Sequence, residues 1–179
     1  MKIYIIRHGT TCWNEKQIIQ GFSNNRLSSA GKVLVEQSSK KYKDTKFDVI
    51  FSSPLMRTMQ TANIMNKYHN VRIIKDARLI EVNQGIFTGR KKSSLTEEEK
   101  LLRKQKSASC GMENFISVYE RTKDFLEFVK TLKYDNVLIV THNVNASLID
   151  CILKNEKVNF EDKKQTNNYH NAEVRSYKI

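Results

Sequence analysis

The chain has 179 residues, of which 39% are hydrophobic, and this suits a single domain over residues 1–179 with a buried core. Its 31 lysines and arginines exceed its 19 acidic residues, and the net charge of +12 favours small anionic ligands unless it only reflects a lysine-rich composition. No zinc-finger spacing, arginine–glycine tract or aromatic RNA-binding motif is present, so we expect no nucleic-acid partner. The first apolar run, Ile3 to Ile6, is too short to cross a bilayer, and we expect no membrane association.

The number and spacing of the cysteines indicate the redox environment of the protein. Cys12, Cys110 and Cys151 are scattered along the chain and form no CxxC pair. An odd number at such spacing argues against a disulfide framework and against a zinc site. The cysteines therefore favour a location in the reducing cytoplasm.

A short buried strand is predicted at Ile3 to Ile6, because this apolar run ends abruptly at a glycine-containing loop. The loop places Arg7 and His8 at the carboxyl end of the strand, where open α/β sheets bind their ligands. A guanidinium offers a charged fork for phosphate, and a neutral imidazole can act as a nucleophile or carry a proton. Taken alone, Arg7-His8-Gly9 is more typical of a surface histidine beside a charge.

The following segments alternate between helix and strand. Ser28 is the expected N-cap of a helix that runs to about Lys43. Residues 47–51, FDVIF, form a second buried strand, and residues 71–74 form a third short one.

A helix start is predicted directly after the second strand. Ser53 is the expected N-cap and Pro54, the single proline of the chain, occupies the first helical position. Arg57 then lies one turn into the helix, at the positive end of its dipole, where anion sites are commonly built. A surface salt bridge is the simpler alternative for Arg57.

The middle of the chain is polar. Residues 79–89 are irregular and contain two glycines, and residues 90–110 are highly charged. Glu97 to Glu99 are predicted to line the solvated face of a helix. Alternatively, residues 90–110 form a lid or substrate-specificity insertion whose lysines and arginines contact the far end of a substrate.

The C-terminal third repeats the pattern of the N-terminus. An amphipathic helix is predicted over residues 112–132, and a buried strand over residues 136–141 ends at His142. A helix over residues 144–153, a loop over residues 155–171 and an edge strand over residues 172–179 complete the chain. Alternating strands and helices predict an α/β fold, a three-layer α/β/α sandwich with a mostly parallel central sheet.

Six segments, in this order, resemble the phosphoglycerate-mutase-like branch of the histidine phosphatase superfamily. They are RHGTTCWN (7–14), QGFSNNRLSSAG (20–31), FSSPLMRTMQTA (51–62), LIEVNQGIFTG (79–89), GMENF (111–115) and VLIVTHN (137–143). The resemblance spans nearly the whole chain, and the fold of the family agrees with the predicted sandwich. It implies that His8 is the nucleophile that becomes phosphorylated and that Glu81 donates a proton to the leaving oxygen. The remaining implied site residues are Arg7, Arg57 and His142 around the phosphate, Asn14 as a polar contact, and Gln20, Gly21 and Asn143 at the border of the substrate.

The chemistry of phosphoryl transfer explains why such residues are needed. Catalysis rests on positioning and on spreading charge over the phosphoryl oxygens, which two arginines and a protonated His142 can do without a metal or cofactor. His8 must be neutral to attack, so we expect its other ring nitrogen to donate to a backbone carbonyl. The acid must hold its proton near neutrality. Glu15 and Glu113 are rival acids, although a capping or dipole role is simpler for Glu113.

Four functions are therefore ranked. The first is a metal-independent phosphomonoester hydrolase that acts on a small phosphorylated metabolite through phosphohistidine. The second is a cofactor-dependent phosphoglycerate mutase, which is less favoured because Glu81 and His142 lie only 61 positions apart, a shorter interval than in the mutases of the family. A non-catalytic phospholigand-binding module and a basic RNA-binding domain follow. The substrate and the oligomeric state stay open.

Overall fold

The computed structural model describes residues 1–105, 108–158 and 168–179. The strands within these ranges are β1 (Lys2–Arg7), β2 (Val49–Ser52), β3 (Arg72–Lys75), β4 (Asn136–Thr141) and β5 (Val174–Lys178). The α-helices are α1 (Cys12–Glu15), α2 (Ser29–Lys41), α3 (Met56–Met65), α4 (Glu97–Gln105), α5 (Phe115–Lys130) and α6 (Asn143–Leu153). Short 3₁₀-helices are η1 (Asn66–Tyr68), η2 (Ala77–Leu79), η3 (Gly85–Phe87), η4 (Lys92–Ser94) and η5 (Ala108–Cys110).

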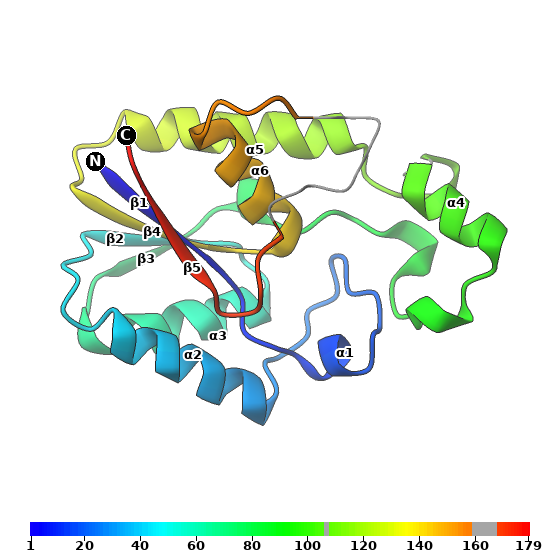
Figure 1. The fold of residues 1–179 in the computed structure, drawn as a ribbon, viewed down its shortest axis with the longest axis horizontal. Helices are drawn as coiled ribbons and strands as arrows, with labels where there is room; N and C mark the ends of the chain where they lie inside the picture. The colour runs from blue at the N-terminus through cyan, green and yellow to red at the C-terminus, as the bar shows by residue number, and fades with distance from the viewer. Residues whose placement is uncertain (106–107, 159–167) are drawn as a thin grey trace.

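The strands form one sheet in the order β3-β2-β4-β1-β5 (Figure 1). Strands β1 to β4 pair in parallel, and β5 joins the edge antiparallel to β1. Arg7 of β1 is in register with Thr141 of β4, and Ser52 of β2 is in register with Val140. Three strands therefore end side by side, and the predicted mostly parallel sheet is confirmed.

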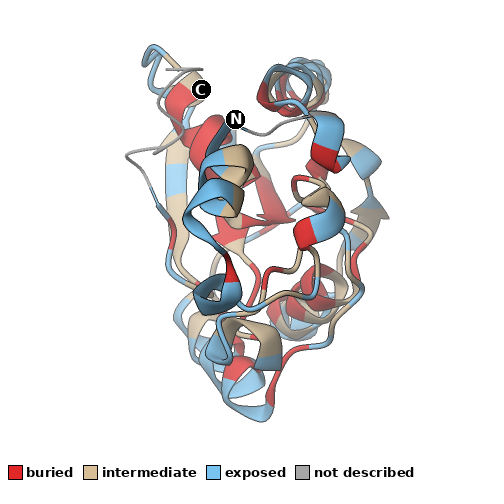
Figure 2. Ribbon diagram, turned by 90° about the vertical axis from the view of Figure 1, so that its right-hand side faces the viewer, coloured by how far each residue is buried: buried red, intermediate tan, exposed pale blue. Residues whose placement is uncertain are grey.

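Helices cover both faces of the sheet. Helices α5 and α6 lie on one face, whereas α2 and α3 lie on the other (Figure 1). Along β1, Ile3 and Ile5 belong to the cluster under α5 and α6, and Tyr4 and Ile6 to the cluster over α2 and α3, because successive side chains of a strand point to opposite faces. Buried residues accordingly occupy the sheet and the inner faces of the helices (Figure 2). The predicted three-layer sandwich is confirmed.

Side-chain caps set the starts of α2 and α5. The Ser28 side chain accepts from the Gly31 amide at 3.1 Å, so the cap predicted for α2 is confirmed. Helix α5 is shorter than the predicted range 112–132, because Asn114 caps it by accepting from the Ile116 amide at 2.8 Å. No helix in the part of the chain that the structure describes is long and apolar enough to cross a membrane.

The predicted start of α3 is wrong. The helix begins at Met56 with Leu55 as its N-cap and without a side-chain cap. Ser53 does not cap it because its hydroxyl lies 2.8 Å from Nε2 of His142, and Pro54 belongs to the turn before the helix. Arg57 is consequently the second residue of α3 and lies within its first turn.

The charged segment 90–110 is only partly as expected. Glu97 and Glu98 are exposed on α4, as predicted. Glu99 is half-buried, however, because its carboxylate pairs with Arg90 and accepts from the Thr96 amide at 2.9 Å. Residues 106–107 of this segment, and residues 159–167 of the loop expected at 155–171, lie outside the described part of the chain.

Candidate active site

A cavity of about 190 Å³ opens where β1, β2 and β4 end. Its walls come from the loop after β1, the first turns of α3 and α6, the irregular segment after η2, and the region of η4 and α4. Eight of the nine predicted site residues line it, namely Arg7, His8, Asn14, Gln20, Gly21, Arg57, Glu81 and Asn143. The ninth, His142, lies directly behind Arg57, with which it shares a hydrogen bond.

His8 follows β1 and is only 3% exposed. Its Nδ1 lies 2.7 Å from the Gly9 carbonyl oxygen, so Nδ1 carries the proton and Nε2 carries the lone pair. The expected hydrogen bond to a backbone carbonyl is thus present. Burial, followed by the charges of Arg57 and Arg7, lowers the pKa of His8 well below its usual value. The neutral imidazole that nucleophilic attack needs is therefore the stable form.

Gly9 holds this histidine loop close to α2. A Cβ atom at this position would meet Val35 Cγ2 at 2.6 Å and the Gly31 carbonyl oxygen at 2.7 Å. The Gly9 amide donates to the Thr61 hydroxyl on α3 at 3.1 Å. The loop after β1 is therefore fixed between the two helices on this face of the sheet.

Arg57 is 1% exposed and directs its guanidinium across the cavity floor. Nη1 donates to the Ser23 carbonyl at 2.6 Å, Nη2 to the Gly21 carbonyl at 2.9 Å, and Nε to Nδ1 of His142 at 3.2 Å. Burial lowers the pKa of Arg57 to about 10, while Glu81 opposes the shift. Arg57 therefore stays cationic at neutral pH.

His142 follows β4 and is the N-cap residue of α6. Its Nδ1 accepts from Arg57, so Nε2 carries the proton and donates to the Ser53 hydroxyl at 2.8 Å. Burial, then Arg57 and His8, lower the pKa of His142 well below its usual value. The protonated form predicted for His142 is therefore wrong for the protein by itself. Only a bound dianion, which favours positive charge nearby, would raise this pKa again.

Arg7 is the second guanidinium of the cavity. Its Nη1 donates to the Tyr169 carbonyl at 2.6 Å, whereas Nε is buried and has no hydrogen-bond partner among the described residues. Burial lowers the pKa of Arg7, and Glu81 and Glu173 partly offset this effect. A buried donor without a partner is costly, so an anion in the cavity would be stabilised here.

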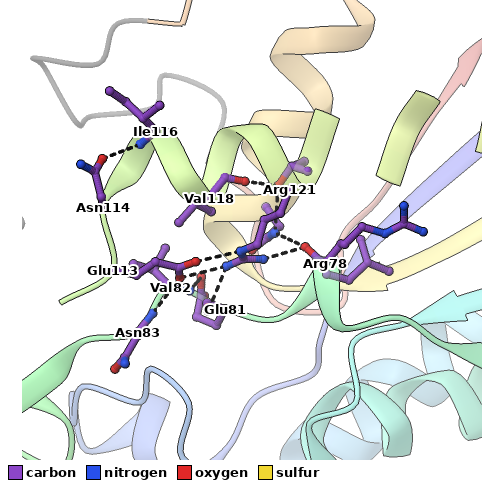
Figure 3. A network of polar contacts seen from close by, with 12 residues as sticks. Arg78, Glu81, Val82, Asn83, Glu113, Asn114, Ile116, Val118 and Arg121 are labelled. Atoms are coloured by element: carbon purple, nitrogen blue, oxygen red, sulfur yellow. Dashed lines mark hydrogen bonds and ion pairs between the residues drawn. The ribbon is translucent and has the colours of Figure 1, made fainter. Parts of the chain in front are cut away.

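Glu81 lines the cavity, and hydrogen bonds to its carboxylate and to its backbone hold it there. Oε1 accepts from the Val82 amide at 3.0 Å. Arg121 of α5 donates to the carbonyls of Arg78 at 2.6 Å and Glu81 at 3.2 Å, and its ion pair with Glu113 measures 2.9 Å (Figure 3). The backbone that carries Glu81 is thus fixed from both sides.

The two rival acids are engaged elsewhere. Glu113 accepts from the Asn83 amide at 3.2 Å in addition to its pair with Arg121, so it binds the Glu81 segment and caps no helix. Glu15 accepts from the Ser28 hydroxyl at 2.6 Å and lines a neighbouring cavity of about 330 Å³. Neither carboxylate lines the cavity that contains His8.

The polar border residues are held by hydrogen bonds from neighbouring residues. Asn14 accepts from the Thr11 amide at 3.0 Å, and Gln20 accepts from the Thr11 hydroxyl at 3.1 Å. Asn143 accepts from the Tyr169 amide at 3.0 Å. Their side chains are therefore oriented before any ligand binds.

Three polar lining residues were not singled out by the sequence, namely Gln84, Lys92 and Arg103. Gln84 lies in the irregular segment that also carries Glu81. Lys92 and Arg103 lie in the charged segment 90–110. For this segment the alternative prediction was that its lysines and arginines contact a substrate, and it named no individual residue. Within the described ranges, no three His, Cys, Asp or Glu side chains are placed to hold a metal ion.

A neutral, buried histidine with a free ring nitrogen, beside two guanidinium groups and a carboxylate, defines a site for phosphoryl transfer. Comparison with known proteins agrees with this class. A model of the histidine phosphatase superfamily (branch 1) matches residues 3–178. Phosphoserine phosphatase 1 of Hydrogenobacter thermophilus is 32% identical over 160 residues, which cover 86% of this chain and 76% of that protein. The chain therefore belongs to the histidine phosphatase superfamily.

Two further similarities bear on fold and function. A protein described as probable phosphoglycerate mutase GpmB, from Escherichia coli, is 39% identical over 105 residues, 59% of this chain and 49% of that protein. The alpha-ribazole phosphatase of Shigella flexneri aligns over 100% of this chain and 91% of its own, with a TM-score of 0.89 at 20% identity, which shows a shared fold. The predicted family and the phosphatase class predicted with it are confirmed.

Proposed function

We propose that the chain is a phosphomonoester hydrolase that acts on a small phosphorylated metabolite through a phosphohistidine intermediate. The observation that supports this most directly is His8. Its Nδ1 is committed to the Gly9 carbonyl at 2.7 Å, and its Nε2 lone pair belongs to a side chain that lines the cavity with Arg7 and Arg57.

In the first half-reaction, Nε2 of His8 attacks phosphorus while the bond between phosphorus and the leaving oxygen breaks. Arg7 and Arg57 stabilise the charge on the phosphoryl oxygens, and His142 joins them once the dianion has raised its pKa. Glu81, in its protonated form, donates its proton to the leaving oxygen. The products are the alcohol and a phosphorylated His8.

In the second half-reaction, water attacks the phosphorus of phosphohistidine and the bond between phosphorus and nitrogen breaks. Glu81, now a carboxylate, accepts the proton of that water. Inorganic phosphate leaves and the neutral imidazole of His8 is restored. The proton that Glu81 loses in the first step is thus regained in the second.

Metal independence belongs to the same proposal. Arg7 and Arg57 supply positive charge where a phosphoryl-transfer enzyme would otherwise use a cation. We also propose that the chain acts as a single domain in the reducing cytoplasm, in keeping with its three free cysteines. Neither a nucleic acid nor a membrane is needed for this activity.

A phosphoglycerate mutase is the second candidate, because a protein with that description shares 39% identity over 105 residues. A mutase uses the same phosphohistidine but transfers the group to a second substrate hydroxyl and excludes water. The two functions therefore differ in whether free phosphate appears.

The test is release of phosphate from a panel of phosphomonoesters in the presence of a chelator, together with 3-phosphoglycerate with and without 2,3-bisphosphoglycerate. The unmutated protein should release phosphate, and His8→Ala should reduce kcat at least about 10⁴-fold. His170→Ala, which removes an exposed histidine, serves as the control and should keep full activity. Isomerisation of phosphoglycerate without phosphate release would support the mutase. Equal activity of His8→Ala would overturn the mechanism.

A further inference from the structure

The tautomer of His8 depends on the direction of one backbone carbonyl. Nδ1 of His8 lies 2.7 Å from the Gly9 carbonyl oxygen, and this hydrogen bond leaves the lone pair on Nε2. Close packing against α2 leaves no room for a Cβ at position 9, and glycine has the most mobile backbone of all residues. The Gly9 carbonyl therefore needs neighbours that stop it from turning away from the ring.

Thr61 of α3 holds the amide that precedes this carbonyl. The Thr61 hydroxyl is buried, donates to the Arg57 carbonyl at 2.8 Å and accepts from the Gly9 amide at 3.1 Å. Because its single proton goes to Arg57, the hydroxyl oxygen faces Gly9 only as an acceptor. Thr61 thus ties the His8 loop to the backbone of Arg57.

Asn171, which precedes β5, holds the other end of the same peptide plane. Nδ2 of Asn171 donates to the His8 carbonyl at 2.9 Å, across 163 positions of sequence. The Ala172 amide lies 3.4 Å from the same oxygen. The peptide between His8 and Gly9 is therefore held at its oxygen by Asn171 and at its nitrogen by Thr61.

The backbone around Asn171 is fixed by residues of the site. The Tyr169 carbonyl accepts from Arg7 at 2.6 Å, and the Tyr169 amide donates to Asn143 at 3.0 Å. Ala172, the next residue, has a φ of 59°, in the left-handed region that residues with a Cβ rarely adopt. Such a conformation persists only where surrounding contacts determine it, and it is common beside active sites.

From this arrangement we propose that Thr61 and Asn171 are positioning residues, which hold the Gly9 carbonyl toward Nδ1 and so keep the His8 imidazole in the tautomer and orientation that attack phosphorus. This inference rests on the proposed phosphatase function and deepens it. Neither Thr61 nor Asn171 lines the cavity of His8, so each acts through the backbone of the nucleophile. Without them the carbonyl can turn away, and the imidazole can then carry its proton on Nε2, where no lone pair is left for attack.

The first test reads the tautomer of His8 by long-range nitrogen–proton NMR correlation at neutral pH, with His8→Gln to assign the signals. The unmutated protein should show a protonated Nδ1 and an unprotonated Nε2. Thr61→Val and Asn171→Ala should each add a population with the proton on Nε2, because loss of one hydrogen bond shifts such an equilibrium about tenfold. Thr61→Ser, which keeps the hydroxyl, and His170→Ala, which removes an exposed neighbour of Asn171, should both keep the single tautomer.

The second test is the rate at which His8 is phosphorylated, measured as release of nitrophenolate from para-nitrophenyl phosphate in a single turnover. This rate should fall about tenfold in Thr61→Val and in Asn171→Ala, because both the reactive tautomer and the orientation of the ring are lost in part. The substrate concentration that gives half the maximal rate should change little, since Arg7 and Arg57 keep their carbonyl partners. Thr61→Ser should restore most of the rate.

Ser39→Ala is the matched control for the loss of a buried hydroxyl. The Ser39 hydroxyl donates to the Ile64 carbonyl near the end of α3 at 2.9 Å, and its side chain belongs to a residue that is 1% exposed. Ser39→Ala should lower resistance to urea as Thr61→Val does. The tautomer of His8 and the phosphorylation rate should nevertheless stay as in the unmutated protein.

The outcomes separate this inference from the proposed function. An unchanged tautomer and unchanged rates in Thr61→Val and Asn171→Ala would overturn the positioning role, whereas phosphate release that is lost in His8→Ala would still support the phosphatase. Equal losses of rate in Ser39→Ala and Thr61→Val, with the tautomer unchanged, would show a general loss of stability, and the inference would be wrong. A shifted tautomer in a protein that releases no phosphate from any compound would support the positioning of His8 and contradict the phosphatase.

Discussion

The two ends of the cavity are built differently. At the phosphate end, His8, Arg57 and His142 follow or border the carboxyl ends of buried strands and are each at most 3% exposed. They are held by backbone carbonyls, by a buried hydroxyl and by one another. At the opposite end, Lys92 is exposed and Arg103 half-buried, and each is held by a glutamine amide.

The two ends of the cavity thus differ in burial and in the groups that hold their charged side chains. The sheet positions the groups that must be neutral or cationic. Burial there shifts their pKa values, and backbone atoms fix their tautomers. Lys92 and Arg103, by contrast, lie on the short helices η4 and α4 outside the sandwich, where neither side chain is fully buried. The following predictions test this difference.

The largest effect is expected at Glu81. Glu81→Gln cannot supply a proton, so kcat should fall about 10²- to 10⁴-fold with an alkyl phosphate such as glycerol 3-phosphate. The loss should be much smaller for the phosphorylation step with para-nitrophenyl phosphate, whose leaving group needs no proton. Steady-state and single-turnover kinetics on both substrates measure this. Equal losses in the phosphorylation step would show that Glu81 is not the acid.

Arg121 is expected to act through Glu81. Arg121→Met removes the donor to the Glu81 carbonyl and leaves Glu113 unpaired, so the free energy of unfolding should fall by about 2–3 kcal/mol. Below the unfolding transition, kcat with alkyl phosphates should fall about tenfold, and the phosphorylation step with para-nitrophenyl phosphate should be slowed less. Lys123→Met, which removes an exposed cation of α5, is the control for urea unfolding and kinetics. A purely structural role would lower both activities alike.

The two buried histidines should make the protein less stable in acid. Their pKa values are lowered in the folded protein, whereas the unfolded chain takes up protons near pH 6.5. The unfolded state therefore binds more protons below this pH, and the free energy of unfolding should fall by about 1.4 kcal/mol per pH unit for each histidine. Denaturant titrations from pH 7 to pH 5 measure the slope. His8→Gln should reduce this slope by the contribution of one histidine, whereas the control His170→Gln should leave it unchanged. An unchanged slope in His8→Gln would contradict the lowered pKa of His8.

The smallest effect is expected on the outer surface of α4. Lys100 and Glu97 form an ion pair at 2.6 Å, with side chains 48% and 90% exposed. Lys100→Ala should change the free energy of unfolding by less than about 0.5 kcal/mol, because solvent screens such pairs. It should also leave substrate selectivity as it is, since Lys100 does not line the cavity. A larger loss of stability in urea unfolding would show that solvent does not screen this pair.

Much of the molecule follows from local sequence patterns. The apolar runs before His8 and His142 are buried parallel strands because no other element hides four to six successive apolar residues so compactly. Parallel strands end at the same edge of a sheet, and because β1 and β4 are also direct neighbours in it, the ring centroids of the two histidines lie 5.2 Å apart. The cap of α2 could also be predicted from local sequence, because the Ser28 side chain accepts from the Gly31 amide only three residues later.

Other features depend on contacts between distant parts of the chain, which no local pattern contains. Ser53 was expected to cap α3, but it bonds to a histidine 89 positions away, and the helix starts later. His142 was expected to be protonated, but burial and Arg57 favour its neutral form. Within the segment 90–110, only the packing of η4 and α4 decided that Lys92 and Arg103 reach the cavity while Lys100 does not. The sequence by itself determined the strands and the fold class, and it placed His8 and His142 at the carboxyl ends of two of those strands. The tertiary structure decided the charge states of the histidines and which residues of the segment 90–110 line the cavity, because both depend on which groups meet after folding.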